Sequence, residues 1–249
     1  MDDLSGKIAL VTGGSSGIGL ASAKLFADQG AQVVITGRRQ AQVDEALEHI
    51  GRGAIGIVGD VADLAHHDSV AHEIMHGLGG LDIYMANAGV NTINHSSKVS
   101  EAEYDAQFAV NTRGVFFGLQ RMTPVLRDGA SVIVTGSIAS DRYMEGHAVY
   151  AGTKAAVFAF VRCWAIELKT RGIRVNVLSP GPVDTPILDK LGLPPESRAQ
   201  LEHHVSQAIP LGRLGEPDEL GQAALFLASD ASSFVTGINL RVDGGMSLL

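Results

Sequence analysis

The chain has 249 residues, a net charge of -8 at pH 7, 45% hydrophobic residues and 30 glycines. This composition is typical of a globular protein with a sizeable core and excludes a disordered or fibrous chain. The acidic balance argues against nucleic acid and against an anionic membrane as partners, because both require a basic surface. We therefore expect a small-molecule ligand.

The cellular compartment is indicated only indirectly. Cys163 is the single cysteine, so an internal disulfide is excluded, which suits a reducing compartment. The stretch MDDLSGKIALVTGG lacks the basic region of a secretory signal. The sequence contains no uninterrupted apolar run of about 18 residues, the length that a membrane span needs. We expect a cytoplasmic protein without a membrane segment.

Seven short apolar runs alternate with segments of helical spacing. One such segment is GIGLASAKLFADQG, where Ile18, Ala21, Leu25 and Phe26 share a face and Gly30 is placed to end the helix. The near-continuous apolar character predicts parallel strands covered on both faces. The sequence thus predicts an α/β fold, a single-domain Rossmann-type doubly wound parallel sheet with helices on both faces and no linker. The seven strands are expected near Lys7, Gln32, Ala54, Leu81, Ser131, Ile173 and Ile238.

The first strand leads into a glycine-rich turn, LVTGGSSGIG. Backbone amides at a helix start attract a diphosphate, and glycines let it approach closely, so the turn predicts a nucleotide site. The same letters fit the G-x-S-x-G elbow of hydrolases, but only twelve residues precede Gly13, too few for the oxyanion-hole loop. Tight helix–strand packing stays open as an alternative. The predicted cofactor contacts here are Gly13, Ser15, Ser16, Gly17, Ile18 and Gly19.

The second strand ends in ITGRRQ, where nucleotide-binding folds place the group that reads the adenosine ribose. A carboxylate for a free 2′-hydroxyl is missing there. Gly37 leaves space, and Arg38 and Arg39 offer guanidinium groups suited to a 2′-phosphate. These residues favour NADP(H), with NAD(H) possible, unless the arginines are ordinary solvated side chains.

The stretch HEIMH, His72 to His76, matches the H-E-x-x-H pattern of zinc peptidases. It falls in the helix predicted between the third and fourth strands, which packs on a flank of the sheet away from the strand ends. We therefore interpret it as a solvated, histidine-rich helix face, treat His203 and His204 in the same way, and predict no metal site.

The fifth strand and the helix after it hold the candidate catalytic residues. Tyr150 and Lys154 of YAGTK are spaced i,i+4 and share a helix face, and Ser137 follows the strand end. A tyrosine with a pKa near 10 is a poor base, but the ammonium and an oxidised nicotinamide would lower that pKa. Ser137 can donate to a carbonyl or alkoxide oxygen. Alone, Y-x-x-x-K is a loose motif; Ser137 and the glycine turn make it informative.

Residues 183–214 interrupt the strand–helix alternation between the sixth strand and a helix opened by Pro217. Inserts of this length are commonly lids or binding segments, so we predict a substrate lid.

The sequence resembles the short-chain dehydrogenase/reductase family over nearly its whole length. The matching stretches are, in order, LVTGGSSGIG, GDVAD, NAG, NTRG, SIAS, YAGTK, LSPGPVDTP and VDGG. Among subgroups it is most similar to NADPH-dependent alcohol dehydrogenases and ketoreductases, through GRR after the second strand and PLGRLGEPDEL. Ser16 departs from the basic residue that NADP-dependent members often carry there.

The resemblance implies roles for particular residues. Ser137, Tyr150 and Lys154 would be catalytic, Asn111 would hold a water in the proton relay, and Lys154 would also bind the nicotinamide ribose. Hydride would pass between nicotinamide C4 and a carbonyl carbon while Tyr150 moves the proton. Further implied cofactor contacts are Asp60 and Val61 at the adenine, Asn87, Ala88 and Gly89 beside the fourth strand, and Pro180, Gly181, Val183 and Thr185 at the nicotinamide.

Substrate and assembly are predicted only coarsely. Hydrophobic ketones or aldehydes fit best, with a 3-oxoacyl-thioester or sugar/polyol reductase, or a non-catalytic dinucleotide sensor or scaffold, as alternatives. The resemblance implies a homotetramer built partly on the apolar helices of EYDAQFAVNTRGVFFGLQRM and YAGTKAAVFAFVRCWAIEL. The expected apolar pocket residues are Ile138, Tyr143, Met144, Ile187, Leu188, Leu191 and Leu193.

Overall fold

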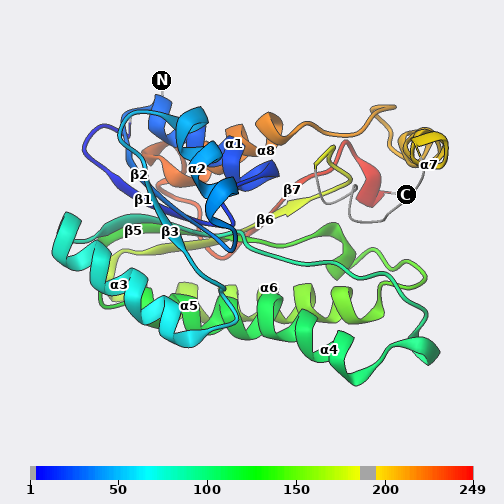
Figure 1. The fold of residues 1–249 in the computed structure, drawn as a ribbon, viewed down its shortest axis with the longest axis horizontal. Coiled ribbons are helices and arrows are strands. Elements are labelled where there is room, and N and C mark those ends of the chain that lie inside the picture. The colour runs from blue at the N-terminus through cyan, green and yellow to red at the C-terminus, as the bar shows by residue number, and fades with distance from the viewer. Residues whose placement is uncertain (1–3, 186–194, 249) are drawn as a thin grey trace.

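A computed structural model describes residues 4–185 and 195–248 of the chain. Its centre is a seven-stranded sheet in the order β3-β2-β1-β4-β5-β6-β7, and every neighbouring pair of strands is parallel (Figure 1). The predicted fold class and all seven predicted strands are confirmed. The strands are β1 Ile8–Thr12, β2 Gln32–Gly37, β3 Ile55–Val58, β4 Leu81–Ala86, β5 Leu126–Thr135, β6 Arg174–Pro180 and β7 Asn239–Val242.

Helices cover both faces of the sheet. Helices α1, α2 and α8 lie on one face, and α3, α4, α5 and α6 lie on the other (Figure 1). Strand order reverses between β1 and β4, the point at which doubly wound sheets open a crevice at the carboxyl ends of their strands. The helices are α1 Gly17–Asp28, α2 Gln40–Ile50, α3 Leu64–Leu78, α4 Glu101–Phe108, α5 Val115–Met122, α6 Ala148–Glu167, α7 Pro195–Gln207 and α8 Pro217–Ala228.

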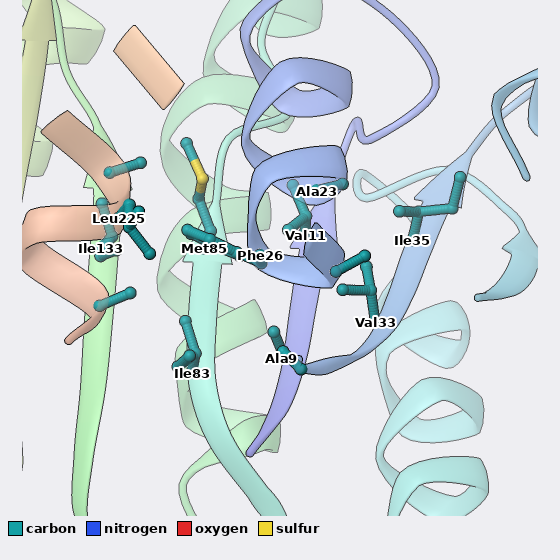
Figure 2. Packing of buried hydrophobic residues seen from close by; sticks show 14 of the residues in the cluster. Ala9, Val11, Ala23, Phe26, Val33, Ile35, Ile83, Met85, Ile133 and Leu225 are labelled. Atoms are coloured by element: carbon teal, nitrogen blue, oxygen red, sulfur yellow. The ribbon is translucent and has the colours of Figure 1, made fainter. Parts of the chain in front are cut away.

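The central strands are buried on both faces because alternate residues point into two separate cores. Ala9 and Val11 of β1 enter the core beneath α1 and α8, together with Phe26 of α1 (Figure 2). Ile8 and Leu10 of the same strand enter the core beneath α3, α5 and α6. This arrangement explains why the central strands contain long apolar runs.

The predicted apolar face of α1 packs against the core, with Phe26 inside it and Ile18 and Leu25 at its margin. Phe26 is fully buried, but Ile18, Ala21 and Leu25 are only half-buried. The helix lies beside α8 on the same face of the sheet, and a Cβ added to Gly221 of α8 would come within 3.4 Å of the Ala21 backbone. Apart from Phe26, the buried positions of the helix therefore carry small residues, Gly19, Ser22, Ala23 and Ala27. Gly30, just after the helix, has a φ of 94°, consistent with its predicted role in ending α1.

Helix α6 is, within residues 4–185 and 195–248, the one helix long and apolar enough to cross a membrane by length and composition. It is a core helix of this fold: Val157, Val161 and Trp164 are buried against the sheet. Its sequence is interrupted by the charged residues Lys154 and Arg162.

The predicted insert contains α7, and the predicted helix at Pro217 is confirmed, with proline in its first turn. Four of the expected pocket residues, Ile187, Leu188, Leu191 and Leu193, lie outside the described residues.

Candidate active site

The predicted site residues follow the carboxyl ends of the strands. Gly13 comes directly after β1, Asn87 after β4, Ser137 shortly after β5 and Gly181 after β6. Because neighbouring parallel strands end at the same edge, these residues gather at one edge of the sheet.

Hydrogen bonds join the glycine turn to the segment after β4. The Thr12 hydroxyl accepts from the backbone amides of Asn87 (3.0 Å) and Ala88 (3.1 Å). The Asn87 side chain donates back to the carbonyls of Thr12 (3.1 Å) and Gly13 (3.3 Å). A Cβ on Gly19 would lie 2.3 Å from the Gly13 oxygen and 2.5 Å from Asn87 Nδ2. Gly19 therefore serves close packing, as the alternative reading of the turn expected.

The backbone amides at the start of α1 are a second indication of a nucleotide site, and close packing does not explain them. Ser16 occupies the N-cap position, but its side chain caps no amide, and the first turn holds no acidic residue. Gly13 and Gly17 both have positive φ, 65° and 53°, which shapes the turn in front of these amides. An uncapped helix start behind a glycine turn fits the diphosphate of a dinucleotide.

The end of β2 brings the predicted ribose-reading residues together. A Cβ on Gly37 would lie 2.8 Å from Ser15 Oγ, so the glycine and the turn serine are adjacent. Arg38 is exposed and forms a loose ion pair of 3.8 Å with Asp60, which follows β3. Arg39 is also exposed and occupies the N-cap position of α2. This corner holds two guanidinium groups at the place expected for a 2′-phosphate.

The three predicted catalytic side chains meet between β5 and α6. Ser137 hydrogen-bonds with the Tyr150 phenol, and its Oγ also accepts from the Ala139 amide at 3.1 Å. Lys154 is 3% exposed, and its Nζ lies 5.8 Å from the centre of the Tyr150 ring. That Nζ donates to the Thr135 carbonyl at 2.8 Å, which fixes the ammonium at the end of β5.

The protonation of this group differs from the expectation that Lys154 lowers the pKa of Tyr150. Burial raises the pKa of Tyr150, and the hydrogen bond from Ser137 opposes that rise without reversing it. Burial lowers the pKa of Lys154 to about 8. The raised pKa favours the protonated phenol, which suits an acid, and a positively charged ligand beside it would lower that pKa.

Asn111 is fully buried in a π-helical segment, Ala109–Gly114, between α4 and α5. Its Oδ1 accepts from the Val90 amide at 2.8 Å, and its Nδ2 donates to the Val90 carbonyl at 2.8 Å and to Thr153 Oγ1 at 3.2 Å. Both Nδ2 hydrogens of Asn111 are already donated, so Asn111 can hold a water only as an acceptor, through one of its oxygen atoms. Its side chain joins the segment after β4 to α6.

The segment after β6 completes the edge. The Gly181 amide donates to the Val242 carbonyl at 3.0 Å, and a Cβ on Gly181 would lie 2.6 Å from Asp243 Cβ. Val183 is buried and pairs with Gly215 in an isolated parallel bridge, and Thr185 Oγ1 donates to the Val183 carbonyl at 3.5 Å. Pro180 ends β6.

Sequence reasoning missed two supporting residues, Thr135 and Thr153. Thr135 holds Lys154 through a backbone carbonyl, which any residue could supply, so no sequence signal marks it. Thr153 accepts from Asn111 and donates to the Tyr150 carbonyl at 2.7 Å, and it could have been noticed within YAGTK.

The histidine motifs lie apart from this edge. The rings of His72 and His76 contact each other on the exposed side of α3, with centroids 4.1 Å apart, and His203 and His204 are exposed on α7. In the described part of the chain, no group of three or more histidine, cysteine, aspartate or glutamate side chains is placed to hold a metal ion.

Comparison with known proteins places the chain. The profile of a family described as Enoyl-(Acyl carrier protein) reductase matches residues 13–247. Oxidoreductase asL5 of Sarocladium schorii is 39% identical over 98% of this chain and 97% of its own, and 3beta-hydroxysteroid dehydrogenase 1 of Eggerthella lenta is 37% identical over 99% and 96%. The crystal structure of levodione reductase superposes with a TM-score of 0.93 at 29% identity, covering 98% of each chain. The chain therefore belongs to the short-chain dehydrogenase/reductase family of NAD(P)-dependent oxidoreductases, which act on carbonyl and alcohol groups.

Proposed function

We propose that this enzyme uses NADPH to reduce hydrophobic ketones or aldehydes to alcohols, and that Ser137, Tyr150 and Lys154 are its catalytic residues. The observation that carries the proposal is the geometry at Tyr150: its phenol is hydrogen-bonded to Ser137 and lies one helical turn from the buried Lys154. The uncapped start of α1 at the same edge of the sheet fits a dinucleotide.

The chain's own groups define the steps. Amides at the start of α1 bind the diphosphate, and Lys154, with two N–H donors left beside its bond to Thr135, donates to ribose hydroxyls. When bound, the reduced nicotinamide supplies a hydride for the carbonyl carbon. Ser137 donates a hydrogen bond to the carbonyl oxygen, and Tyr150 delivers the proton that completes the alcohol. Alcohol oxidation follows the same path in reverse.

The preference for NADPH over NADH rests on the corner formed by Gly37, Arg38 and Arg39. Arg38 is 60% exposed and meets Asp60 only at 3.8 Å, so its guanidinium is free to turn toward a phosphate. We expect Arg38→Ala to raise the KM for NADPH about tenfold or more, the usual worth of a charge-assisted hydrogen bond. The KM for NADH should stay within about twofold. Arg52→Ala, an exposed arginine after α2, is the matched control. An equal change in both KM values for Arg38→Ala would contradict the preference.

The hydrophobic substrate class is supported by apolar side chains near the Ser137 turn. Tyr143 is 82% exposed, Met144 is 38% exposed and Ile93 is 46% exposed. A Cβ on Gly146 would lie 2.8 Å from Ile93 Cγ2, so the segments that carry these side chains adjoin. The steroid dehydrogenase relative also supports a large apolar substrate, whereas the acyl-carrier description of the family profile supports the 3-oxoacyl-thioester alternative.

A homotetramer and a cytoplasmic location complete the proposal. Phe116, Phe160 and Trp164 form an aromatic cluster across α5 and α6. A shallow hollow of about 450 Å³ beside it is lined by Phe108, Phe116, Phe117 and Phe160, among others. Apolar surface of this kind favours association. Light scattering coupled to size-exclusion chromatography should give about four times the chain mass, and a monomer would contradict this part.

Steady-state oxidation of NADPH and NADH with a panel of carbonyl compounds tests the proposed function. The panel should hold cyclic and aromatic ketones, aldehydes, a 3-oxoacyl thioester and ketoses. We expect turnover with NADPH and apolar ketones above all. Fastest turnover with ketoses or with the thioester would replace the substrate class by one of the alternatives. Tight nucleotide binding without turnover on any member would favour the dinucleotide sensor instead.

A further inference from the structure

We propose that Arg241 is a positioning residue for this reaction: its ion pair with Asp141 holds the turn that carries Ser137 against the last strand of the sheet. The inference rests on the proposed function of Ser137. It concerns the C-terminal segment Arg241–Leu248, which contains none of the groups that the mechanism uses.

The turn behind Ser137 is a short, internally bonded unit. The 3-10 helix Ile138–Ser140 has Ser137 as its N-cap residue and Asp141 as its C-cap residue. The Ser140 hydroxyl donates to the Ser137 carbonyl at 2.9 Å, and Ser137 Oγ accepts from the Ala139 amide. Because Ser137 and Asp141 stand at the two ends of this bonded turn, a shift of Asp141 is passed on to Ser137.

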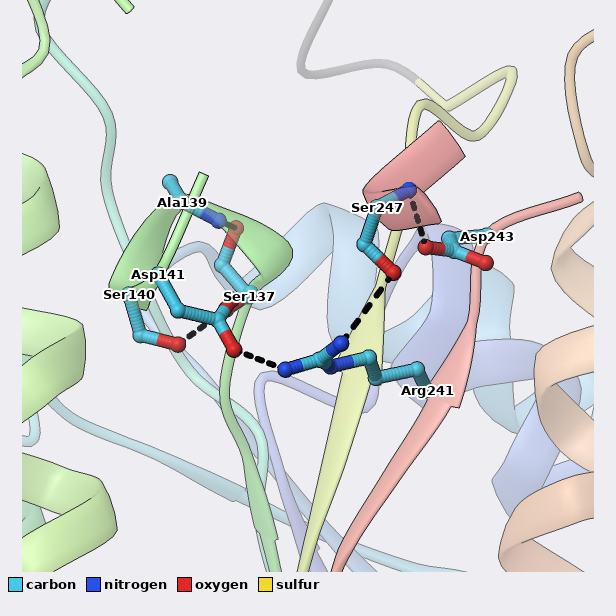
Figure 3. A network of polar contacts seen from close by, with 7 residues as sticks. All are labelled: Ser137, Ala139, Ser140, Asp141, Arg241, Asp243 and Ser247. Atoms are coloured by element: carbon cyan, nitrogen blue, oxygen red, sulfur yellow. Dashed lines mark hydrogen bonds and ion pairs between the residues drawn. The ribbon is translucent and has the colours of Figure 1, made fainter. Parts of the chain in front are cut away.

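Arg241 forms an ion pair with Asp141, at the end of the turn opposite Ser137. Its guanidinium extends from β7 to the Asp141 carboxylate, across 100 positions of the sequence (Figure 3). It also donates to Ser247 Oγ at 3.5 Å. The Asp243 carboxylate accepts from the amides of Gly245 and Ser247, both at 2.9 Å, so the segment that supports Arg241 is itself ordered.

Apolar packing joins the same segments. Ile138, next to Ser137, forms a small buried cluster with Met246 of the C-terminal segment and Ile209, which follows α7. The Leu211 amide donates to the Gly244 carbonyl at 3.2 Å. The C-terminal segment thus contacts the Ser137 turn on one side and the end of the insert on the other.

The expected effect on catalysis exceeds the effect on stability. Arg241 and Asp141 are 42% and 40% exposed, and ion pairs that exposed contribute little to folding. A small misplacement of a group that must meet a reacting oxygen, in contrast, lowers turnover strongly. We expect Arg241→Gln and Asp141→Asn each to lower kcat about three- to tenfold, with little change in Tm or in the KM for the nucleotide.

Two comparisons separate positioning from general structure. Arg241→Lys and the exchanged pair Asp141→Arg/Arg241→Asp should recover most of kcat, and the double variant Asp141→Asn/Arg241→Gln should be no worse than either single one. The matched control is Arg127→Gln, which breaks a 2.8 Å ion pair with Asp82 at the amino-terminal ends of β4 and β5. Arg127→Gln should lower the free energy of unfolding at least as much as Arg241→Gln does, and it should leave kcat unchanged.

Hydrogen exchange followed by mass spectrometry tests the tether without turnover. Amides of residues 137–142 should exchange faster in Arg241→Gln than in wild type, and those in Arg127→Gln should not. If residues 137–142 exchanged at the wild-type rate in Arg241→Gln, the inference would be overturned. It would also be overturned if these amides exchanged faster while Arg241→Gln kept the kcat of wild type. Wild-type protein without turnover would defeat the proposed function alone, and the exchange result would then decide whether Arg241 holds the turn.

Discussion

Replacement of Lys154 by methionine should stabilise the folded protein while it abolishes turnover. Lys154 is 3% exposed, and burial lowers its pKa from 10.5 to about 8. A difference of that size corresponds to about 3 kcal/mol of burial cost at neutral pH. The methionine also loses the hydrogen bond to the Thr135 carbonyl, which costs about 1–3 kcal/mol when the carbonyl is left unpaired. We expect a net gain in the free energy of unfolding of about 1 kcal/mol at pH 7.

The pH dependence of the stability difference between wild type and Lys154→Met separates the cost of burying the ammonium from the other effects of the substitution. Below pH 8 the lysine holds its proton in both states, so the folded state bears the full cost. Between about pH 8 and pH 10.5 the folded state has released the proton and the unfolded state still binds it, so wild-type stability rises with pH. The advantage of Lys154→Met should therefore shrink by about 2 kcal/mol between pH 7 and pH 9.5. Packing and hydrogen-bond differences cancel in this comparison, because they do not depend on pH.

Urea unfolding at several pH values between 7 and 9.5 measures this directly, through midpoints compared at unchanged m values. Lys98→Met, a replacement at an exposed lysine, should keep the pH profile of the wild type. The reasoning is refuted if the difference between wild type and Lys154→Met is the same at pH 7 and pH 9.5, because the ammonium would then be solvated in the folded protein.

Three further outcomes follow from the same structure. Tyr150→Phe should bind the nucleotide normally and lower turnover by about two to four powers of ten, measured by fluorescence titration and steady-state rates; near-normal turnover would remove Tyr150 from the acid role. Gly19→Ala places a Cβ 2.3 Å from the Gly13 oxygen, so the affinity for the nucleotide, measured by calorimetry, should fall sharply. The control Gly77→Ala, whose Cβ would meet nothing within 4 Å, should bind like wild type. Equal nucleotide affinities of Gly19→Ala and wild type would show that the turn does not bind the nucleotide. The pKa of buried His66 is lowered chiefly by desolvation, so below about pH 6.5 the unfolded state binds more protons than the folded state, and the free energy of unfolding should fall as the pH drops. His66→Leu should lose less stability than wild type between pH 7 and pH 5 in urea titrations. An equal loss of stability in both proteins would contradict this role of His66.

The fold could be predicted because the sheet imposes a simple pattern. A strand covered on both faces must be apolar at every position, so IALVT and QVVIT are visible without knowledge of their partners. The detailed faces of α1 were harder to predict, since burial there depends on how closely α8 approaches. The start of β5 at Leu126, before the predicted run near Ser131, reflects a shift of register against β4.

The grouping of the candidate catalytic side chains was predictable, because their residue types and spacing are visible in the sequence. Ser137, Tyr150 and Lys154 have a fixed spacing along one strand end and one helix, and the structure brings them together. The direction of the Tyr150 pKa was not predictable, because it is set chiefly by burial, and burial is a property of the fold. The bonds of Asn111 to the Val90 backbone were equally hidden, since a backbone partner leaves no mark in the sequence.

The fate of the hydride and the proton tests the central claim most directly. Wild-type enzyme should be given an apolar ketone and NADPH carrying deuterium at the transferred position of C4, with Tyr150→Phe in parallel and the alcohol analysed by mass spectrometry. The account predicts one deuterium on the carbinol carbon of the wild-type product and almost no product from the variant. Product alcohol without deuterium, or equal yields from both enzymes, would contradict it.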